Sequence, residues 1–219
     1  VMNYPLKDAI ISYVQSGKTS QLRETLFMLM DNYPKETLDC LMNILGTHDT
    51  PRILTVFGEK NCSNKDEMAV TFLSEREKAA AKQRVMMAAV LQFTLPGIPC
   101  IYYGDENAME GYQDPFCRRC FDWLHTDEEL LAFYQKLGAL RRQFPVFRDG
   151  EYDEVYADAG CLVYARKGAA QTVYVWVNNS HSEYSIRVDG TFEEHLTQTI
   201  FHDRTECGPK SYGIFTKVQ

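Results

Sequence analysis

Two polar loops carry most of the side chains in this chain that could take part in chemistry. The first loop, GTHDTPR at residues 46–52, holds His48 and Asp49. The second loop, residues 104–123, holds Asp114 and Arg118 among other charged side chains. Each loop follows a short apolar run of the kind that forms a buried strand. Catalytic groups of β/α barrels lie at this position, at the C-terminal ends of parallel strands, so the two loops together indicate a site.

The elements that must position these loops alternate between strand and helix up to residue 144. The apolar periodicity and capping signals predict strand segments at 1–4, 43–46 and 97–103, and helices at 6–14, 20–31, 75–94 and 127–143. Ser20 is the predicted N-cap of the second helix, and Ser74 with Glu77 forms a predicted capping box for the third. Strands that alternate with helices in this way predict a parallel sheet with crossover helices.

The pattern changes after residue 144. Short runs rich in Val, Tyr, Ile and Thr are separated by turn signals such as Asp189-Gly190, and they predict strands at 152–156, 161–166, 172–178, 184–188 and 212–218. We therefore expect two domains, a β/α part at 1–144 and a small antiparallel β-sandwich domain at 145–219.

The β/α part is too short to close on itself. A complete eight-stranded barrel needs about 250 residues, whereas residues 1–144 supply three strands and their helices. An open edge and uncovered apolar helix faces would remain. These residues are expected to be the last three strands of a (β/α)8 TIM barrel whose N-terminal half is missing from the chain.

Composition narrows the functional classes. The net charge of −7 argues against nucleic acid or an anionic membrane surface as a partner. The most apolar stretch, residues 85–103, is interrupted by Pro96 and Pro99 and is not a membrane span. The seven cysteines are scattered and odd in number, which indicates a reducing compartment, the cytoplasm. Cys117 and Cys120 lack a second ligand pair, so we expect no metal site there.

The two loops resemble motifs of the α-amylase family of glycoside hydrolases. GTHDTPR at 46–52 is similar to the segment after the family's seventh barrel strand. GIPCIYYGDE at 97–106, with DPFCR at 114–118, is similar to the eighth strand and its loop. The combination most resembles the neopullulanase, cyclomaltodextrinase and maltogenic amylase branch, over residues 1–147.

The resemblance implies a role for each site residue. Asp49 matches the third carboxylate of the family, which binds sugar hydroxyls and stabilises the transition state of retaining hydrolysis. His48 matches the histidine that binds the same sugar, and Asp114 and Arg118 match a loop pair that closes the sugar pocket. The nucleophile and the general acid belong to earlier strands, so we expect the chain alone to be inactive.

The implied activity is cleavage of α-1,4 and also α-1,6 glucosidic bonds in maltodextrins, cyclodextrins or pullulan. An α-glucan, the missing half of the barrel and a second copy in a homodimer are the expected partners, with no cofactor expected and calcium in the larger protein left open. Two alternatives stay open: a transglycosylase or isomerase on the same scaffold, and a non-catalytic sugar-binding or structural fragment. Arg52 is expected to be structural, pairing with a carboxylate near the barrel mouth, and a structural role is also expected for Asp105 and Glu106.

Overall fold

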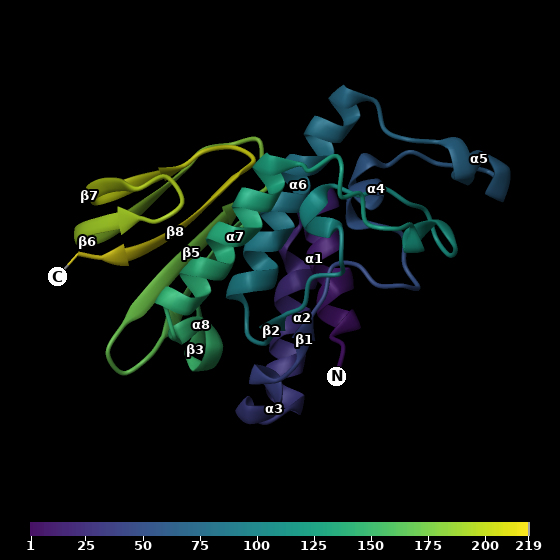
Figure 1. The fold of residues 1–219 in the computed structure, drawn as a ribbon. Coiled ribbons are helices and arrows are strands. Elements are labelled where there is room, and N and C mark those ends of the chain that lie inside the picture. Colours follow the sequence, from purple (N-terminus) through teal and green to yellow (C-terminus); the bar gives the residue numbers. More distant parts are fainter. Residues whose placement is uncertain (219) are drawn as a thin grey trace.

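The computed structural model describes residues 1–218, and its helices and strands follow the chain as drawn in Figure 1. In order these elements are α1 (Tyr4–Ser16), α2 (Thr19–Asn32), α3 (Lys35–Asp39), β1 (Met42–Asn43), α4 (Ile53–Gly58), α5 (Lys65–Val70), α6 (Glu75–Thr94), β2 (Ile98–Pro99), the 3-10 turns η1 (Asp105–Asn107) and η2 (Phe116–Arg118), α7 (Glu128–Gln143), α8 (Val146–Asp149), β3 (Glu151–Asp158), β4 (Cys161–Lys167), β5 (Thr172–Asn178), β6 (Tyr184–Glu194), β7 (Thr199–Cys207) and β8 (Ser211–Lys217).

A narrow parallel sheet forms the centre of the β/α part. Met2 bridges Met42 in parallel, and β1 pairs in parallel with β2. Helices α1 to α3 connect the first pair of strand segments, and α4 to α6 connect the second pair. The predicted parallel strands with crossover helices are therefore confirmed, and their C-terminal ends lie at one edge of the sheet.

The strands of this sheet are shorter than predicted. β1 covers Met42–Asn43 instead of 43–46, and β2 covers Ile98–Pro99 instead of 97–103. Among residues 1–218 no further strand pairs with β2 on its outer side. Two hydrogen bonds join the segments: the Ile98 N–H donates to the Leu41 carbonyl at 2.7 Å, and the Cys100 N–H donates to the Asn43 carbonyl at 2.8 Å. The intervening Pro99 has no N–H to offer to a strand on the outer side.

The four long helices agree well with the sequence patterns, whereas the short helices α3, α4, α5 and α8 were not predicted. The long central helix α6 has the predicted bounds, and the capping box of Ser74 and Glu77 is present. The predicted capping role of Ser20 is wrong, because α2 already begins at Thr19 and Lys18 is its N-cap, without a side-chain hydrogen bond. The chain leaves α1 through Gly17 at φ 73° and enters α2 at once, so Ser20 lies inside the first turn.

The C-terminal part is an antiparallel sheet in the order β3-β4-β5-β8-β6-β7. The last strand, β8, lies inside this order and pairs with β5 on one side and with β6 on the other. The predicted antiparallel β domain is thus present. Its six strands form one continuous sheet rather than two separate sheets.

This sheet curls so that its two faces have different neighbours. One face, with Leu162, Tyr164 and Val175, shares a hydrophobic core with the helices. The other face encloses an aromatic cluster in which Phe201 of β7 lies 5.5 Å from Phe215 of β8, ring centre to ring centre. The β6–β7 hairpin therefore folds over the sheet to which it belongs, which gives the domain a sandwich-like interior.

The sequence patterns missed one strand and misread one turn. The edge strand β7 is largely exposed, and its polar residues lack the alternation of a half-buried strand. Asp189-Gly190 is not the end of β6 but a bulge within it, where the register with β7 shifts and Gly190 adopts φ 110°.

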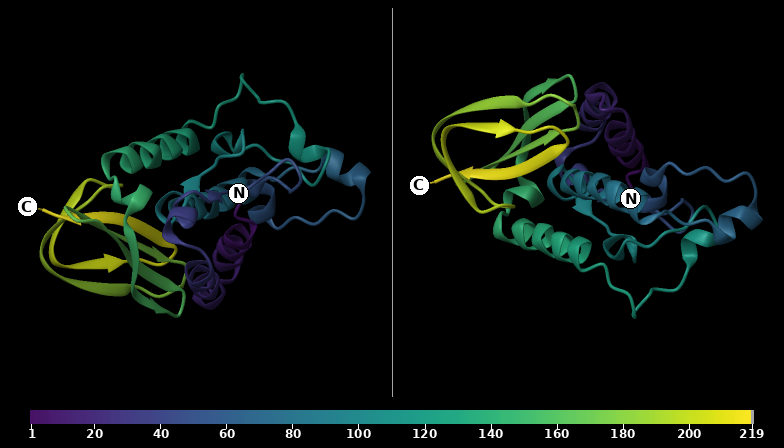
Figure 2. Two further views of the ribbon diagram at one scale, coloured as in Figure 1. Left: turned by 90° about the horizontal axis from the view of Figure 1, so that it is seen from below. Right: turned by 90° about the horizontal axis from the view of Figure 1, so that it is seen from above.

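The two parts pack on each other without an exposed linker (Figures 1 and 2). The Tyr13 hydroxyl of α1 donates to the carbonyls of Gly160 and Val177, at 2.8 and 2.9 Å. Arg166 of β4 is fully buried and donates to the carbonyls of Thr94 and Gly150, each at 2.7 Å. The boundary between 144 and 145 stays a prediction.

Candidate active site

The site begins with a tight turn directly after β1. Thr47 is buried, and its N–H donates to the Thr50 hydroxyl at 3.0 Å. The Asp49 N–H in turn donates to the Thr47 hydroxyl at 3.2 Å. Hydroxyl contacts of this kind fix a turn locally, so the backbone itself directs the side chains of His48 and Asp49 outward.

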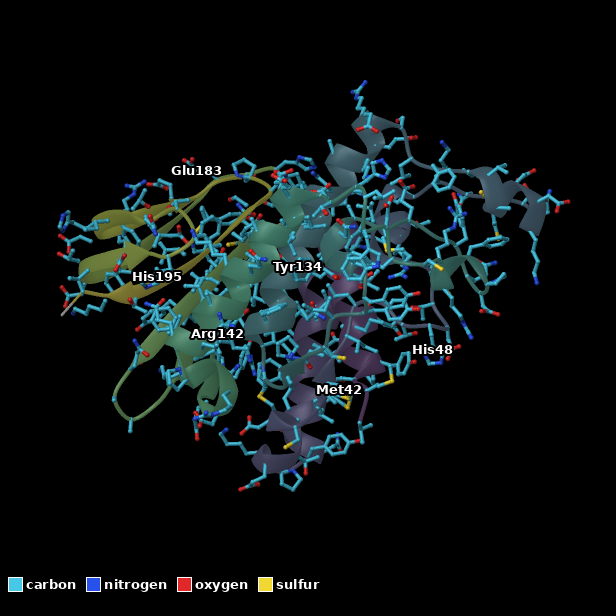
Figure 3. The ribbon with its side chains drawn as sticks, in the orientation of Figure 1. Met42, His48, Tyr134, Arg142, Glu183 and His195 are labelled. Atoms are coloured by element: carbon cyan, nitrogen blue, oxygen red, sulfur yellow. The ribbon has the colours of Figure 1, made fainter. Side chains whose placement is uncertain are left out.

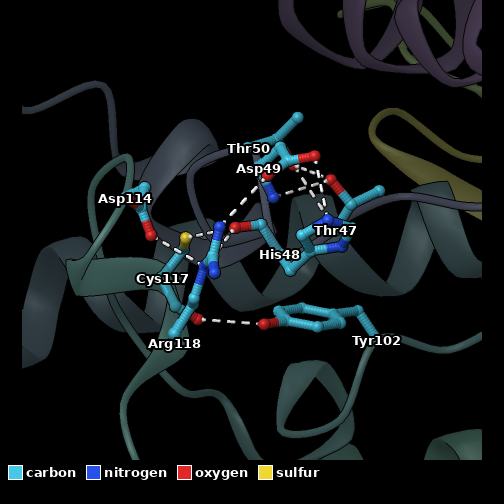
Figure 4. Close-up of polar contacts among 8 residues, drawn as sticks. All are labelled: Thr47, His48, Asp49, Thr50, Tyr102, Asp114, Cys117 and Arg118. Atoms are coloured by element: carbon cyan, nitrogen blue, oxygen red, sulfur yellow. Dashed lines mark hydrogen bonds and ion pairs between the residues drawn. The ribbon is translucent and has the colours of Figure 1, made fainter.

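The second loop brings Asp114 and Arg118 to the same turn. Arg118 Nη2 lies 3.2 Å from Asp49 Oδ1, and Arg118 Nε lies 2.7 Å from Asp114 Oδ1. His48 Nε2 lies 3.0 Å from Asp49 Oδ2. All four side chains predicted for the site therefore form one connected polar cluster, drawn in Figure 4.

The cluster is open to solvent. The side chain of Asp49 is 58% exposed, and that of Arg118 is 48% exposed. Figure 3 places His48 at the loop end of the molecule, away from the antiparallel sheet, where Glu183 and His195 flank β6. A polar ligand can therefore reach the carboxylate and the guanidinium from one side.

A second connection joins the loops through the backbone of His48. Its carbonyl oxygen accepts from Arg118 Nε at 3.0 Å and from Cys117 Sγ at 3.1 Å. The Cys117 carbonyl accepts from the Tyr102 hydroxyl at 3.4 Å. The sequence patterns did not indicate that Cys117 and Tyr102 make these contacts. For the turn itself, by contrast, the Thr-x-x-Thr spacing of Thr47 and Thr50 is a usable signal.

Beneath the cluster lies a buried ionic layer. Arg52 and Asp105 are both buried, with Arg52 Nη1 3.7 Å from Asp105 Oδ1. The Arg52 guanidinium also lies over the rings of Tyr102 and Tyr103, at 4.3 and 4.5 Å from their centres, and donates to the Tyr103 carbonyl. The expected pairing of Arg52 with a carboxylate is confirmed.

Burial controls the charge state of Asp105. Its removal from water raises the pKa of the carboxyl to about 7, although the positive charge of Arg52 opposes this shift. The position of Asp105 also explains why residue 46 is a glycine, because a Cβ on Gly46 would lie 2.9 Å from Asp105 Oδ2. Only glycine lets the turn after β1 approach the buried carboxyl so closely.

The cysteines and other possible ligands do not gather into a metal centre in the described part of the chain. Within residues 1–218 no three His, Cys, Asp or Glu side chains are placed to hold one ion. Cys117 is buried against His48, whereas Cys120 is exposed. Across the same residues, no helix has the length and apolar character needed to cross a membrane.

Parallel strands whose ends carry this polar cluster, followed by an antiparallel β domain, define the C-terminal part of a β/α-barrel protein. The sequence profile described as "Alpha amylase, catalytic domain" matches residues 1–124. The chain belongs to the α-amylase family.

Named relatives agree with this assignment. The chain is 34% identical over 192 residues to a cyclomaltodextrinase of Geobacillus thermopakistaniensis, covering 85% of this chain and 29% of the relative. It is 33% identical over 199 residues to a maltogenic α-amylase of Bacillus acidopullulyticus, covering 86% and 30%. The chain thus spans less than a third of the length of these curated relatives.

Solved structures share the fold. An α-amylase of Geobacillus thermoleovorans, complexed with acarbose, superposes with a TM-score of 0.80 at 22% identity, covering 98% of this chain and 47% of the other. A cyclomaltodextrinase structure superposes with a TM-score of 0.80 at 25% identity, covering 99% and 36%. Almost the whole chain therefore corresponds to a part of a longer folded unit in these proteins.

Proposed function

We propose that this chain supplies the C-terminal part of a retaining glycoside hydrolase that cleaves α-glucosidic bonds in maltodextrins, cyclodextrins or pullulan. Cleavage of α-1,4 bonds is the main activity proposed, with α-1,6 bonds as a second linkage. The single observation that carries the proposal is the half-exposed Asp49, held between His48 and Arg118 at the ends of two parallel strands. Membership of the α-amylase family supports it.

The proposed role of Asp49 follows from its surroundings. An exposed carboxylate accepts hydrogen bonds from sugar hydroxyls, and contacts that tighten as the ring flattens favour the transition state. His48 donates to Asp49 or to the sugar. Arg118 neutralises the carboxylate in the free protein and offers its donors to sugar oxygens when a glucan binds.

The bond-breaking groups come from outside this chain in the proposed mechanism. Retaining hydrolysis needs a carboxylate nucleophile and a carboxylic acid about 5–5.5 Å apart. We propose that earlier barrel strands supply both, that the chain alone is inactive, and that the complete protein works in the cytoplasm as a homodimer. The length of the relatives, of which the chain spans 29–30%, supports a larger parent protein.

The test is Asp49→Asn in the protein with its complete barrel. We expect kcat on maltodextrin to fall at least about 100-fold, the usual effect of removing one preorganised transition-state contact. The melting temperature should stay nearly unchanged, because the carboxylate is exposed. Asp158→Asn, which alters an exposed aspartate at the end of β3, is the matched control. A full turnover rate in Asp49→Asn would refute the proposal.

A further inference from the structure

We propose that Cys117 is a positioning residue for Asp49, acting through the carbonyl oxygen of His48. The inference deepens the proposed function and rests on it. The observation behind it is the thiol hydrogen bond from Cys117 Sγ to the His48 oxygen, at 3.1 Å. No substrate contact is assigned to the thiol.

The His48 carbonyl controls the direction of Asp49 because the two belong to one peptide unit. The peptide bond is planar, so fixing the carbonyl oxygen also fixes the N–H and Cα of Asp49. Arg118 Nε donates to the same oxygen at 3.0 Å, and a carbonyl has two lone pairs to accept both donors. The Asp49 N–H is held on the other side by the Thr47 hydroxyl at 3.2 Å.

Cys117 is well placed to hold this peptide permanently. It is fully buried on the 3-10 turn η2, and its own carbonyl accepts from the Tyr102 hydroxyl at 3.4 Å. Two residues further along the loop, the carbonyl of Arg119 accepts from the Tyr103 hydroxyl at 2.9 Å. Since both tyrosine rings pack against the buried Arg52, the loop is anchored on the β2 side as well.

The loop path leaves little room for movement around Cys117. A Cβ on Gly111 would lie 2.2 Å from the Phe116 carbonyl oxygen and 3.2 Å from Cys117 Cα. The Gly111 carbonyl accepts from the Arg52 N–H at 2.8 Å, where α4 begins. The backbone at Cys117 is therefore packed closely against the backbone at Gly111.

Arg118 cannot perform this role by itself. Its Nε is shared between the His48 carbonyl and Asp114, and its Nη2 pairs with Asp49. In the proposed function these donors turn to sugar oxygens when the glucan binds. The thiol has no competing acceptor of this kind, because it is buried, so it can keep the turn in place while Arg118 changes partners.

The experiment compares three variants in the protein with its complete barrel. Cys117→Ala and Cys117→Val remove the donor, with and without a cavity, while Cys117→Ser keeps a donor. We expect kcat on maltodextrin to fall about 10-fold in the Ala and Val variants, because a small misplacement of a catalytic group is costly, with KM within about twofold. The Ser variant should recover most of the lost turnover. Cys120→Ala, exposed in the same loop, should match the unaltered protein.

A double variant tests whether the thiol acts through Asp49. If it does, Cys117→Ala should cause no further loss when it is combined with Asp49→Asn, because effects of groups that act as a unit are not additive. An independent further loss in the double variant, relative to Asp49→Asn alone, would overturn the inference. So would unchanged kcat in the Ala and Val variants, an equal loss in the Ser variant, or a change in KM alone.

The inference and the proposed function fail in different ways. A fully active Asp49→Asn variant refutes the proposed function and removes the basis for a positioning role. An inactive Asp49→Asn variant together with a fully active Cys117→Ala variant refutes only the positioning role. Melting temperatures of all variants separate misfolding from misplacement, and Cys117→Ser gives a result even where the Ala variant does not fold.

Discussion

Arg118 serves three acceptors with one planar group. Nε reaches the His48 carbonyl and Asp114, while Nη2 reaches Asp49. A guanidinium holds its donors in a rigid fork, whereas a lysine ammonium is a single point charge on a flexible stem. The geometry of the cluster therefore depends on arginine and not only on positive charge.

Replacing Arg118 by lysine tests this dependence. We expect Arg118→Lys in the complete protein to lower kcat/KM on maltodextrin about 10-fold, since one ammonium cannot reach all three acceptors at once. Steady-state kinetics provide the measurement. Arg142→Lys, which changes an exposed arginine on α7, is the control and should leave kcat/KM as it was. Equal kinetics for the two variants would show that charge alone is enough.

Asp105 makes a pH-dependent contribution to stability. Burial raises its pKa to about 7, above the unfolded value of about 4. Between these pH values the folded state binds more protons than the unfolded state. The contribution of Asp105 to the free energy of unfolding therefore falls as the pH rises from about 4 to about 7, and it is constant at higher pH. Asp105→Asn abolishes this titration.

The melting temperature of Asp105→Asn, relative to the unaltered protein, should therefore rise as the pH increases from 4.5 to 7.5 (about the window given by the two pKa values). Loss of the contact with Arg52 can shift the melting temperature of Asp105→Asn by a constant amount, but a constant shift does not change how the difference in melting temperature varies with pH. Thermal unfolding at several pH values is the measurement. Parallel curves for the two proteins would mean that Asp105 titrates normally.

At the residue scale, the polar side chains of the site could be predicted better than their supports. His48, Asp49, Asp114 and Arg118 come together because both loops follow adjacent parallel strands, which the alternation of elements already indicates. The contact of the Cys117 thiol with the His48 carbonyl depends on the path of a 3-10 turn. A weak donor at a buried position gives no periodic or spacing signal.

At the element scale, the long helices were easier to predict than the strands for physical reasons, whereas the short helices α3, α4, α5 and α8 were missed. The limits of α6 are encoded locally by Ser74, Glu77 and the proline after its end. A strand such as β7 is defined by its partner, and its own residues are mostly exposed and polar. The bulge at Gly190 carries the same Asp-Gly signal as a turn, so only pairing with β7 distinguishes the two.

The C-terminal end of α6 is held by an arginine from the next helix. Arg141 of α7 donates to the carbonyls of Phe93 and Gly97, at 2.7 and 2.6 Å. Burial lowers the pKa of Arg141 to about 10, so the group is still charged at neutral pH. A positive charge at this end also favours the helix dipole.

Arg141→Ala should therefore destabilise the protein by about 2 kcal/mol, because two carbonyls lose charged donors. The adjacent Arg142→Ala changes an exposed side chain of the same helix and should stay within about 0.5 kcal/mol. Chemical denaturation of both variants is the measurement. Similar unfolding midpoints for the two would show that the contacts of Arg141 contribute little.

At the scale of the whole molecule, the outer edge of the parallel sheet is open, and apolar side chains in and just after β2 are exposed. Ile98 is 46% exposed, and Ile101 and Tyr103 are 40% and 39% exposed. Within residues 1–218 no strand covers the outer side of β2. Edges of this kind promote pairing between chains, and in a longer protein further barrel strands would cover them.

The 219-residue chain produced alone should therefore self-associate, which light scattering can measure. Ile101→Lys, at the open edge, should reduce the association, because a charge there opposes edge pairing. Val70→Lys, on the exposed helix α5, is the control and should leave the association unchanged. A monodisperse monomer at the highest concentrations would contradict this prediction.

The interior position of β8 makes the order of synthesis important. Residues 211–217 lie between β5 and β6, although they are translated after both. While the ribosome still holds these residues, β5 and the β6–β7 hairpin have no common neighbour to pair with. A premature stop codon before Ser211 would therefore remove a central strand of the β domain rather than an edge strand. It would leave the three-stranded β3–β4–β5 unit and the β6–β7 hairpin unjoined and exposed to proteases.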